Sequence, residues 1–269
     1  MRYKLTLEYD GTDLLGWQRQ LDGPSAQEYL ETAIACFNGT EKVFTDEKGT
    51  LHNPFLQYGK EPLICVQCAG RTDAGVHALM QVAHFDMDKK VDTFRLREGI
   101  NAHLRNNDIP LVVISAETVS DDFHARFSAT GRGYIYRILN RRSAPVIEKN
   151  RVWWVPCPLN VEKMKEAAAY LLGNHDFSSF RAAACQAKSP VKTLDKLDIF
   201  TVGDEIRFIV EARSFLHHQV RNMVGTLKMV GAEQLQPQDM TKILEAKNRA
   251  QAGPTAPACG LYLSKVVYD

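Results

Sequence analysis

The sequence predicts a mixed α/β (α+β) fold of two halves, with mostly antiparallel sheets that carry helices on one face and form a central cleft on the other. Short strands of alternating polarity recur along the chain, and amphipathic helical stripes separate them. The order β-α-β-β-α-β occurs twice, which is the split β-α-β order of ferredoxin-like modules. Because the halves repeat element order without evident sequence identity, we expect a pseudo-two-fold body.

The first half is expected to span residues 1–120. Tyr3 to Tyr9 alternate as a strand with one buried face, and Ser25 with Glu28 forms a capping box that begins a helix. Between residues 38 and 62 the chain is polar and rich in turn formers, which indicates a surface insertion or a β-hairpin. The elements expected in this half are a strand over 3–9, a helix over 26–37, strands over 63–69 and 79–85, a helix over 93–104 and a strand over 111–118.

The second half is expected to span residues 121–269 and to repeat the order. A hairpin follows its first helix, and one additional helix precedes the last strand. The expected elements are a strand over 134–140, a helix over 160–172, hairpin strands over 194–202 and 205–213, helices over 215–231 and 238–247, and a strand over 261–268.

Composition is that of an ordinary globular protein, with 45% hydrophobic and 24% charged residues and a formal charge of +1. No apolar run reaches the roughly 18 residues of a membrane span, and the N-terminus lacks the apolar segment of a secretory signal. We therefore expect a cytoplasmic protein with no membrane partner.

The six cysteines are scattered apart from the pair Cys65 and Cys68. On the expected strand, positions three apart face opposite sides, so these thiols are poorly placed to share a metal. We expect reduced thiols rather than disulfides in a chain of this size.

The chemically richest stretch is Gly70 to Ala78, GRTDAGVHA, which lies between two expected strands. Two glycines bracket Asp73, and glycine permits crowded or left-handed backbone in loops that carry catalytic groups. On spacing alone Asp73 is either a turn residue or a catalytic carboxylate.

Basic residues gather in three stretches that contain no Asp or Glu, over 123–147, 177–194 and 212–232. The first interleaves five arginines with Phe123, His124, Phe127 and tyrosines, a mixture typical of surfaces that hold a polynucleotide backbone and an unstacked base. Single runs of this kind are commonly solvated faces. Three of them in a nearly neutral chain favour an anionic polymer as ligand.

Arg221 lies within an otherwise apolar helical pattern, where a guanidinium normally has an anionic partner. Asp73 is the partner we expect, because an adjacent cation stabilises the ionised carboxylate that a nucleophile requires. His217 and His218 precede Arg221, and adjacent helical residues point about 100° apart, so a shared metal ion is not expected there.

The sequence lacks the glycine-rich fingerprints of nucleotide and dinucleotide sites and the His-x-x-x-His pair of zinc enzymes. We expect a reaction that needs neither a cofactor nor a metal.

Six blocks in order along the chain resemble the tRNA pseudouridine synthase A family. They are YDGTDLLGWQRQ at 9–20, AGRTDAGVHA at 69–78, DDFHARFSAT at 121–130, GNHDFSSFRA at 173–182, HHQVRNMVG at 217–225 and AGPTAPACGLYL at 252–263. The resemblance implies an isomerase that converts uridine to pseudouridine in the anticodon stem-loop of tRNA, at tRNA positions 38–40, without cofactor and as a homodimer.

Carried over residue by residue, the resemblance makes Asp73 the catalytic nucleophile, Tyr134 the aromatic residue that stacks on the target base, and Arg221 the partner of the aspartate. Arg71 resembles the side chain that fills the gap left by the flipped base. The resemblance also implies a set of tRNA-contacting residues: Phe123, His124, Ala125, Arg126, Phe127, Arg142, Ala184, Cys185, Gln186, Ala187 and Lys188.

The physical logic agrees with these roles, because a stacked base must be extruded before its glycosidic bond can be attacked. The chain departs from the family pattern in the long 38–62 connection, in Gly133 where a basic residue is common, and in Gln219 where Met is usual. Two other readings of the residues are an RNA-binding or chaperone module with a structural Asp73, and a metal-dependent phosphoesterase that uses Asp73, His77 and His84.

Overall fold

The computed structural model describes residues 1–183 and 185–269, which form two compact units. The first unit is Met1–Thr130 with Tyr268–Asp269, and the second is Gly131–Val267. Each unit mixes helices with mostly antiparallel strands, so the predicted α/β class is confirmed. The predicted central cleft stays a prediction.

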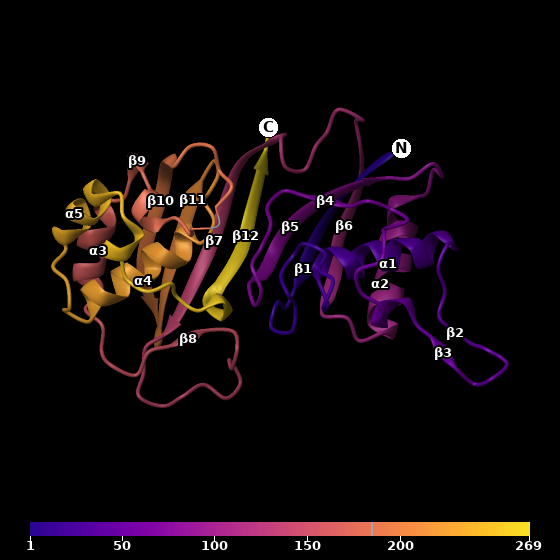
Figure 1. Cartoon of the computed structure of the whole chain (residues 1–269), viewed down its shortest axis with the longest axis horizontal. Helices are drawn as coiled ribbons and strands as arrows, with labels where there is room; N and C mark the ends of the chain where they lie inside the picture. Colours follow the sequence, from indigo (N-terminus) through magenta and orange to yellow (C-terminus); the bar gives the residue numbers. More distant parts are fainter. Residues whose placement is uncertain (184) are drawn as a thin grey trace. The chain divides into compact units, whose positions relative to one another are not determined.

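The first unit contains an antiparallel sheet in the order β6-β1-β5-β4, beside which the helices α1 and α2 pack on each other (Figure 1). Tyr3, Leu5 and Leu7 are fully buried on one face of β1, as their alternation predicts. The elements are β1 (Arg2–Tyr9), α1 (Ala26–Asn38), β2 (Phe44–Thr45), β3 (Leu51–His52), β4 (Gln67–Cys68), β5 (His77–Asp86), α2 (Thr93–Asn106) and β6 (Leu111–Val119).

Local signals at the ends of α1 explain its limits. The Ser25 side chain accepts a hydrogen bond from Glu28 N, and Gly39 ends the helix with φ 78°. The Glu28 side chain does not complete the predicted capping box in the usual way, because its carboxylate accepts from Arg19 and from Gly59 N.

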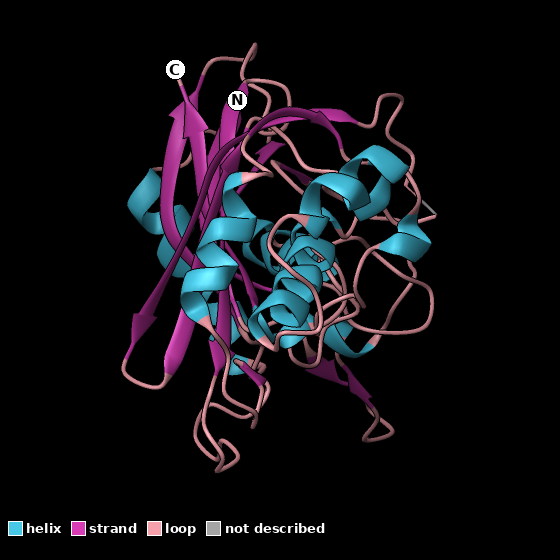
Figure 2. Ribbon diagram, turned by 90° about the vertical axis from the view of Figure 1, so that its left-hand side faces the viewer, coloured by secondary structure: helices cyan, strands magenta, loops and turns pink. Residues whose placement is uncertain are grey.

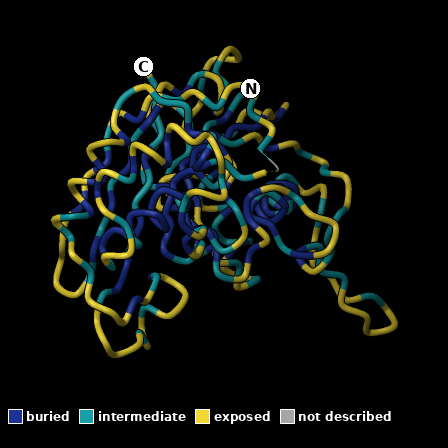
Figure 3. Tube along the Cα trace, turned by 60° about the vertical axis from the view of Figure 1, so that its left-hand side comes forward, coloured by how far each residue is buried: buried dark blue, intermediate teal, exposed yellow. Residues whose placement is uncertain are grey.

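The insertion predicted over 38–62 contains the β2–β3 hairpin, which extends away from α1 and α2 in Figure 1. The hairpin strands are exposed or half-buried (Figure 3), whereas Phe55 after the hairpin is buried and packs near Tyr29 at 6.5 Å between ring centroids. The insertion is therefore anchored at its second end.

The second unit contains a sheet in the order β12-β7-β11-β10-β9, with α3 packed against α4 and β10 (Figure 2). β8 pairs with β7 in parallel, while β11 pairs antiparallel with both β7 and β10. The elements are β7 (Ala129–Leu139), β8 (Trp153–Trp154), α3 (Val161–Ala169), β9 (Gly173–Asp176), β10 (Val191–Val202), β11 (Glu205–Ala212), α4 (Gln219–Gly231), α5 (Asp239–Ala246) and β12 (Leu261–Tyr268).

Several expected limits of elements are wrong. β7 begins five residues and β10 three residues before the expected start, and α3 ends three residues before the expected end. The strand expected over 63–69 is only β4, because Glu31 Oε1 accepts from Val66 N and holds that part of the chain outside the ladder. The helix expected from Phe215 begins at Gln219, because the Gln219 side chain accepts from Leu216 N and His218 is left-handed at φ 61°. Residues 121–130 belong to the first compact unit, and the expected division of the chain into halves at residue 120 stays a prediction.

Among the described helices, none has the length and apolarity needed to cross a membrane.

Candidate active site

The Gly70–Ala78 loop connects β4 to β5, and hydrogen bonds fix its backbone on both sides of Asp73. Trp17 N donates to Thr72 O at 2.9 Å, and Gln81 Nε2 donates to Gly70 O at 2.7 Å. The hydroxyls of Tyr9 and the buried Thr72 lie 2.7 Å apart. Neighbouring elements therefore hold the loop backbone at several points, which is the kind of support that a precisely positioned functional group requires.

Two glycines of the 9–20 block let the chain pass directly over this loop. A Cβ at Gly11 would lie 2.1 Å from Val76 O, and a Cβ at Gly16 would lie 2.6 Å from Thr72 O. Gly16 also has φ +96°, where other residues are strained. The 9–20 block therefore packs directly against the Gly70–Ala78 loop.

The three residues at the start of the loop differ in their burial. Thr72 is buried, whereas Asp73 is half-buried and Arg71 is exposed. Val76 N donates to Asp73 O at 3.1 Å, so the backbone of Asp73 serves the turn while its side chain remains accessible. The turn reading and the catalytic reading of Asp73 are therefore compatible.

His77 and His84, the histidines of the phosphoesterase reading, are both buried and bound to backbone amides. Gly11 N donates to His77 Nδ1 at 3.0 Å, and Ala125 N donates to His84 Nδ1 at 3.2 Å. Burial, with His124 and Arg2 nearby, lowers the pKa of His84 to about 4. These contacts favour structural roles for both imidazoles.

His84 also anchors the 121–128 segment. Arg2 Nη1 donates to Phe123 O at 2.9 Å, while Arg2 Nη2 lies 2.7 Å from Asp86 Oδ2. Tyr268 Oη donates to Ala125 O at 2.7 Å. The hydrogen bonds with His84, Arg2 and Tyr268 therefore fix the backbone of this segment, which contains the predicted RNA-contacting residues Phe123 to Phe127.

The other side of this segment presents aromatic and cationic groups. Phe127 is 76% exposed, and its ring centroid lies 4.3 Å from that of His124. The exposed Arg126 guanidinium lies 5.7 Å from the Phe127 centroid. An exposed aromatic ring next to a guanidinium is a surface on which an unstacked base can lie.

Tyr134 lies on β7 opposite Val210, half-exposed, with its ring edge-on to Phe215 at 5.2 Å. Arg221 lies in the first turn of α4, half-buried, and its Nε donates to Ala256 O at 2.8 Å. Both side chains are thus fixed by neighbours of their own unit.

The predicted contact residues of the second unit lie on loops. Ala182 N donates to His217 O at 3.0 Å, and His217 N donates to Cys185 Sγ at 3.4 Å, so this loop is tied to the turn before α4. Arg142, Gln186 and Lys188 are exposed and Ala187 is half-buried. Ala184 lies outside the described residues.

His217 and His218 precede α4 instead of lying within it, so the helical argument about their directions was wrong. Their ring centroids are 4.0 Å apart. The left-handed turn at His218 brings the two rings together.

Asn222, which the sequence reasoning missed, joins three of the family-like sequence blocks of the second unit. Its Nδ2 donates to Phe180 O at 2.8 Å, and its Oδ1 accepts from Thr255 Oγ1 at 2.6 Å and from Arg249 Nη2 at 3.1 Å. It is fully buried. The available signal was an amide side chain among apolar residues of a buried helix.

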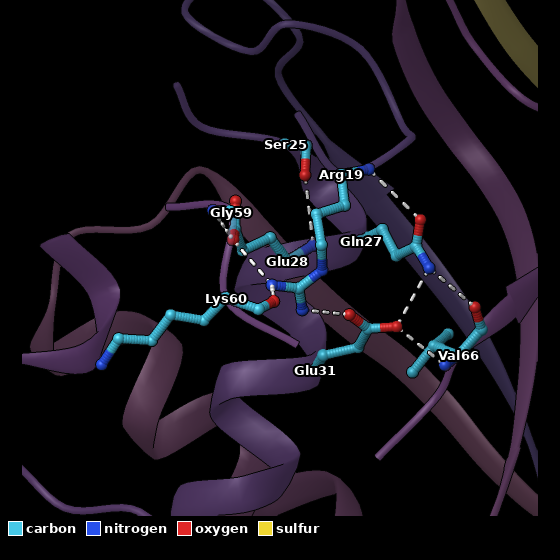
Figure 4. A network of polar contacts seen from close by, with 8 residues as sticks. All are labelled: Arg19, Ser25, Gln27, Glu28, Glu31, Gly59, Lys60 and Val66. Carbon is cyan, nitrogen blue, oxygen red and sulfur yellow. Dashed lines mark hydrogen bonds and ion pairs between the residues drawn. The ribbon is translucent and has the colours of Figure 1, made fainter. Parts of the chain in front are cut away.

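A buried ionic network, also missed, precedes the Gly70–Ala78 loop in the sequence (Figure 4). Arg19 Nη1 lies 2.7 Å from Glu28 Oε1, and Arg19 Nη2 bonds to Glu31 Oε2. Gly59 N donates to Glu28 and Val66 N donates to Glu31, each at 2.9 Å. The network ties the 9–20 block and α1 to the chain that leads into β4 and the loop.

The paired cysteines do not lie on one long strand. Cys65 is exposed before β4, and Cys68 lies in β4, where burial raises the pKa of its thiol to about 12. All six cysteines are free thiols, as predicted. A thiol with so high a pKa is a packing group at neutral pH.

A mixed α/β chain with a clamped aspartate loop and an aromatic, cationic surface fits an enzyme that acts on RNA. A family model described as tRNA pseudouridine synthase matches residues 6–128 and 167–269. The chain belongs to this family, whose members are isomerases.

Similar proteins extend over essentially the whole chain. The tRNA pseudouridine synthase A of Paramagnetospirillum magneticum is 52% identical over 268 residues, which cover 100% of this chain and 95% of that protein. The proteins of the same name from Rhodospirillum centenum and Bartonella henselae are 51% and 46% identical over 267 residues, with 99% of each chain covered. The predicted family is therefore confirmed.

Proposed function

We propose that the protein isomerises uridine to pseudouridine in the anticodon stem-loop of tRNA, at positions 38–40, with Asp73 as nucleophile and without cofactor or metal. The observation that carries the proposal is the clamped loop, in which backbone bonds to Thr72 and Gly70 fix the chain while Asp73 remains accessible. The family membership supports the reaction and the tRNA substrate.

The chemistry divides into extrusion, cleavage and rejoining. Flipping the target uridine costs a few kcal/mol of stacking, which Tyr134 offsets by stacking on the base and Arg71 by filling the gap. The Asp73 carboxylate then either displaces uracil N1 from ribose C1′ or adds to uracil C6, after which the bond between C1′ and N1 breaks. The uracil rotates and C5 bonds to C1′, while the bond from the Asp73 oxygen to C1′ or C6 breaks and returns the carboxylate. C5 loses its proton, and N1 gains one.

This sequence of steps consumes no electrons and no phosphate, so the atoms balance without a co-reactant. Arg221 is proposed as the cationic partner of the Asp73 carboxylate. The remaining residues of the proposed tRNA surface hold the substrate, and the protein acts in the cytoplasm as a homodimer.

The test is incubation of the protein with unmodified tRNA transcript, followed by mapping of pseudouridine with carbodiimide adducts. We expect adducts in the anticodon stem-loop with wild type, and a rate lowered on the order of 10³-fold or more in Asp73→Ala and Asp73→Asn, which remove the nucleophile. Asp13→Asn, an exposed carboxylate of the neighbouring block, is the matched control and should retain activity.

Activity in Asp73→Ala would remove Asp73 from the mechanism. A wild-type protein that binds tRNA without forming pseudouridine would favour the RNA-binding or chaperone reading instead. Inhibition by a chelator, restored by added metal, would favour the phosphoesterase reading.

A further inference from the structure

A polar pocket of the second unit is lined by residues to which no role has been assigned above. It has a volume of about 200 Å³ and opens at one end of the sheet, where β9, β10 and the chain after β11 meet. Its lining residues are Asn174, Val191, Lys192, Thr193, Arg213 and Ser214. Pockets for drug-sized ligands measure about 300–1,000 Å³, so this one suits a smaller group.

The lining carries two cations and no carboxylate. Lys192 belongs to the acid-free stretch 177–194 and Arg213 to the acid-free stretch 212–232, so the fold brings two basic stretches of the sequence to one pocket. In the described part of the chain, neither side chain forms an ion pair with a carboxylate.

The remaining polar groups are placed to donate. Asn174 Nδ2 donates to Thr193 Oγ1 at 2.9 Å, which leaves the threonine O–H to point elsewhere. Arg213 O accepts from Arg132 Nη1 at 2.9 Å, so its backbone is fixed while the guanidinium is exposed. A guanidinium, an ammonium and hydroxyl donors together match the oxygens of a phosphate group.

The pocket is continuous in sequence with the proposed base-stacking position. Ser214 of the lining precedes Phe215, whose ring packs edge-on against Tyr134 at 5.2 Å. Arg132, which holds Arg213, lies two residues before Tyr134 on β7. A group held in the pocket therefore lies near whatever stacks on Tyr134.

We propose that Lys192 and Arg213 form a subsite for one backbone phosphodiester of the tRNA strand near the target nucleotide. This inference rests on the proposed function for its substrate and adds a contact that positions the strand. The donors of this subsite could bind the oxygens of any phosphate group. The experiment therefore distinguishes a nucleic-acid phosphodiester from free inorganic phosphate.

The experiment measures the dissociation constant for unmodified tRNA against KCl concentration in Lys192→Gln, Arg213→Gln and the double variant. We expect each single variant to bind about 3- to 10-fold more weakly, with a salt slope about 0.7–0.9 less steep for the lost phosphate contact. Lys192→Arg should keep the affinity and the salt slope of the wild type, since it keeps the cation. Saturating kcat should remain unchanged in all of them.

Lys196→Gln is the matched control, because Lys196 lies on the same strand, carries the same charge and pairs with Asp198 at 3.2 Å outside the pocket. An equal effect of Lys196→Gln, or an unchanged slope in the double variant with an unchanged Tm, would overturn the subsite. So would binding of inorganic phosphate that depends on Lys192 while tRNA binding does not. If the Gln variants unfold, Lys192→Arg against Lys192→Met with matched Tm decides in the same way.

The two proposals fail separately. A wild type that forms no pseudouridine, with the slope still reduced in Lys192→Gln, would overturn the function and retain the subsite. Normal pseudouridine formation by the wild type, with an unaltered salt slope in Lys192→Gln, would overturn the subsite and retain the function.

Discussion

His84 is a single titrating side chain whose protonation state affects the stability of the proposed RNA-contacting segment. Its Nδ1 accepts from Ala125 N, and its ring lies 4.7 Å from that of His124, with Arg2 nearby. Asp86 opposes these cations and raises the pKa, but burial is the larger effect. The neutral imidazole is thus the form that holds the 121–128 segment.

The sign of the resulting pH dependence follows from a pKa lowered from 6.5 to about 4. The unfolded protein binds a proton that the folded protein excludes, so stability is present above pH 6.5 and falls as the pH drops toward 4. Between pH 7.5 and pH 5.0 His84 should account for a loss of about 2 kcal/mol in the free energy of unfolding.

Urea unfolding of wild type and His84→Gln at both pH values measures this contribution. The wild type should lose about 2 kcal/mol more than His84→Gln over this range. The lowered pKa of His124 acts in the same direction and remains in both proteins. His103→Gln is the control, and a His84→Gln protein with wild-type pH dependence would contradict the assignment.

At the scale of elements, strands with one buried face were predictable because their polarity alternates with period two. β1, β6 and β12 lie within about one residue of their predicted limits, and α2 buries Leu96, Ile100 and Leu104 as its stripe predicts. Such patterns are local, so they survive without knowledge of the tertiary fold.

The errors arose where distant groups capture the backbone. The Leu63–Ala69 strand is shortened by the bond from Val66 N to Glu31, and the turn before α4 is held by Ala182 N bonded to His217 O. The candidate site shows the same division. Asp73 was identifiable from its glycine-bracketed loop and block resemblance, whereas the contacts of the preceding Thr72 with Tyr9 and Trp17 join segments about 60 residues apart.

The Arg19 network joins several elements, and its loss should have a large effect on the free energy of unfolding. Glu28 and Glu31 are each 2% exposed, and one guanidinium neutralises both. Burial raises the pKa of Glu28. Arg19→Met leaves two buried carboxylates without a cation, which should cost about 3–5 kcal/mol of unfolding free energy at neutral pH.

The deficit should shrink at low pH. Burial raises the pKa of Glu28 and Arg19 lowers it by a smaller effect, so Arg19→Met raises this pKa further. Protonation of Glu28 then favours the folded variant at low pH, and this contribution is lost as the pH rises through the folded pKa. Urea unfolding at pH 5 and pH 8 should therefore show a larger deficit for Arg19→Met at pH 8. Arg97→Met, which removes the surface pair with Glu98, should cost about 0–1 kcal/mol at both. Equal deficits of the two variants would contradict the network's role.

At the scale of the whole molecule, the near-zero net charge conceals a strong separation. The second unit has 20 Lys and Arg against 12 Asp and Glu, a formal +8, whereas the first has 13 against 20, a formal −7. The basic stretches found in the sequence account for much of the positive unit. A nucleic acid is therefore attracted chiefly to one of the two units, despite a pI near 7.6.

This separation predicts a steep salt dependence for a protein of almost no net charge. The cations proposed to contact tRNA are Arg71, Arg126, Arg142, Lys188, Lys192 and Arg213. Arg71 fills the gap in the stack, and Lys192 and Arg213 share one phosphate, so these cations make four phosphate contacts. At about 0.7 each they give a slope of about −3 in log K against log salt, or a loss of about 60-fold between 50 and 200 mM KCl. Filter binding with unmodified tRNA over this range measures the slope.

The molar mass at each salt concentration, from light scattering, is the control, because dissociation of the proposed homodimer also weakens binding. Lys89→Gln in the acidic unit should leave the slope unchanged, and Arg142→Gln should lower it by about 0.7. A slope near −1 at constant mass would show that few phosphates are neutralised. The tRNA surface would then have to depend on stacking at Phe127 and Tyr134, and the basic stretches would be solvated faces.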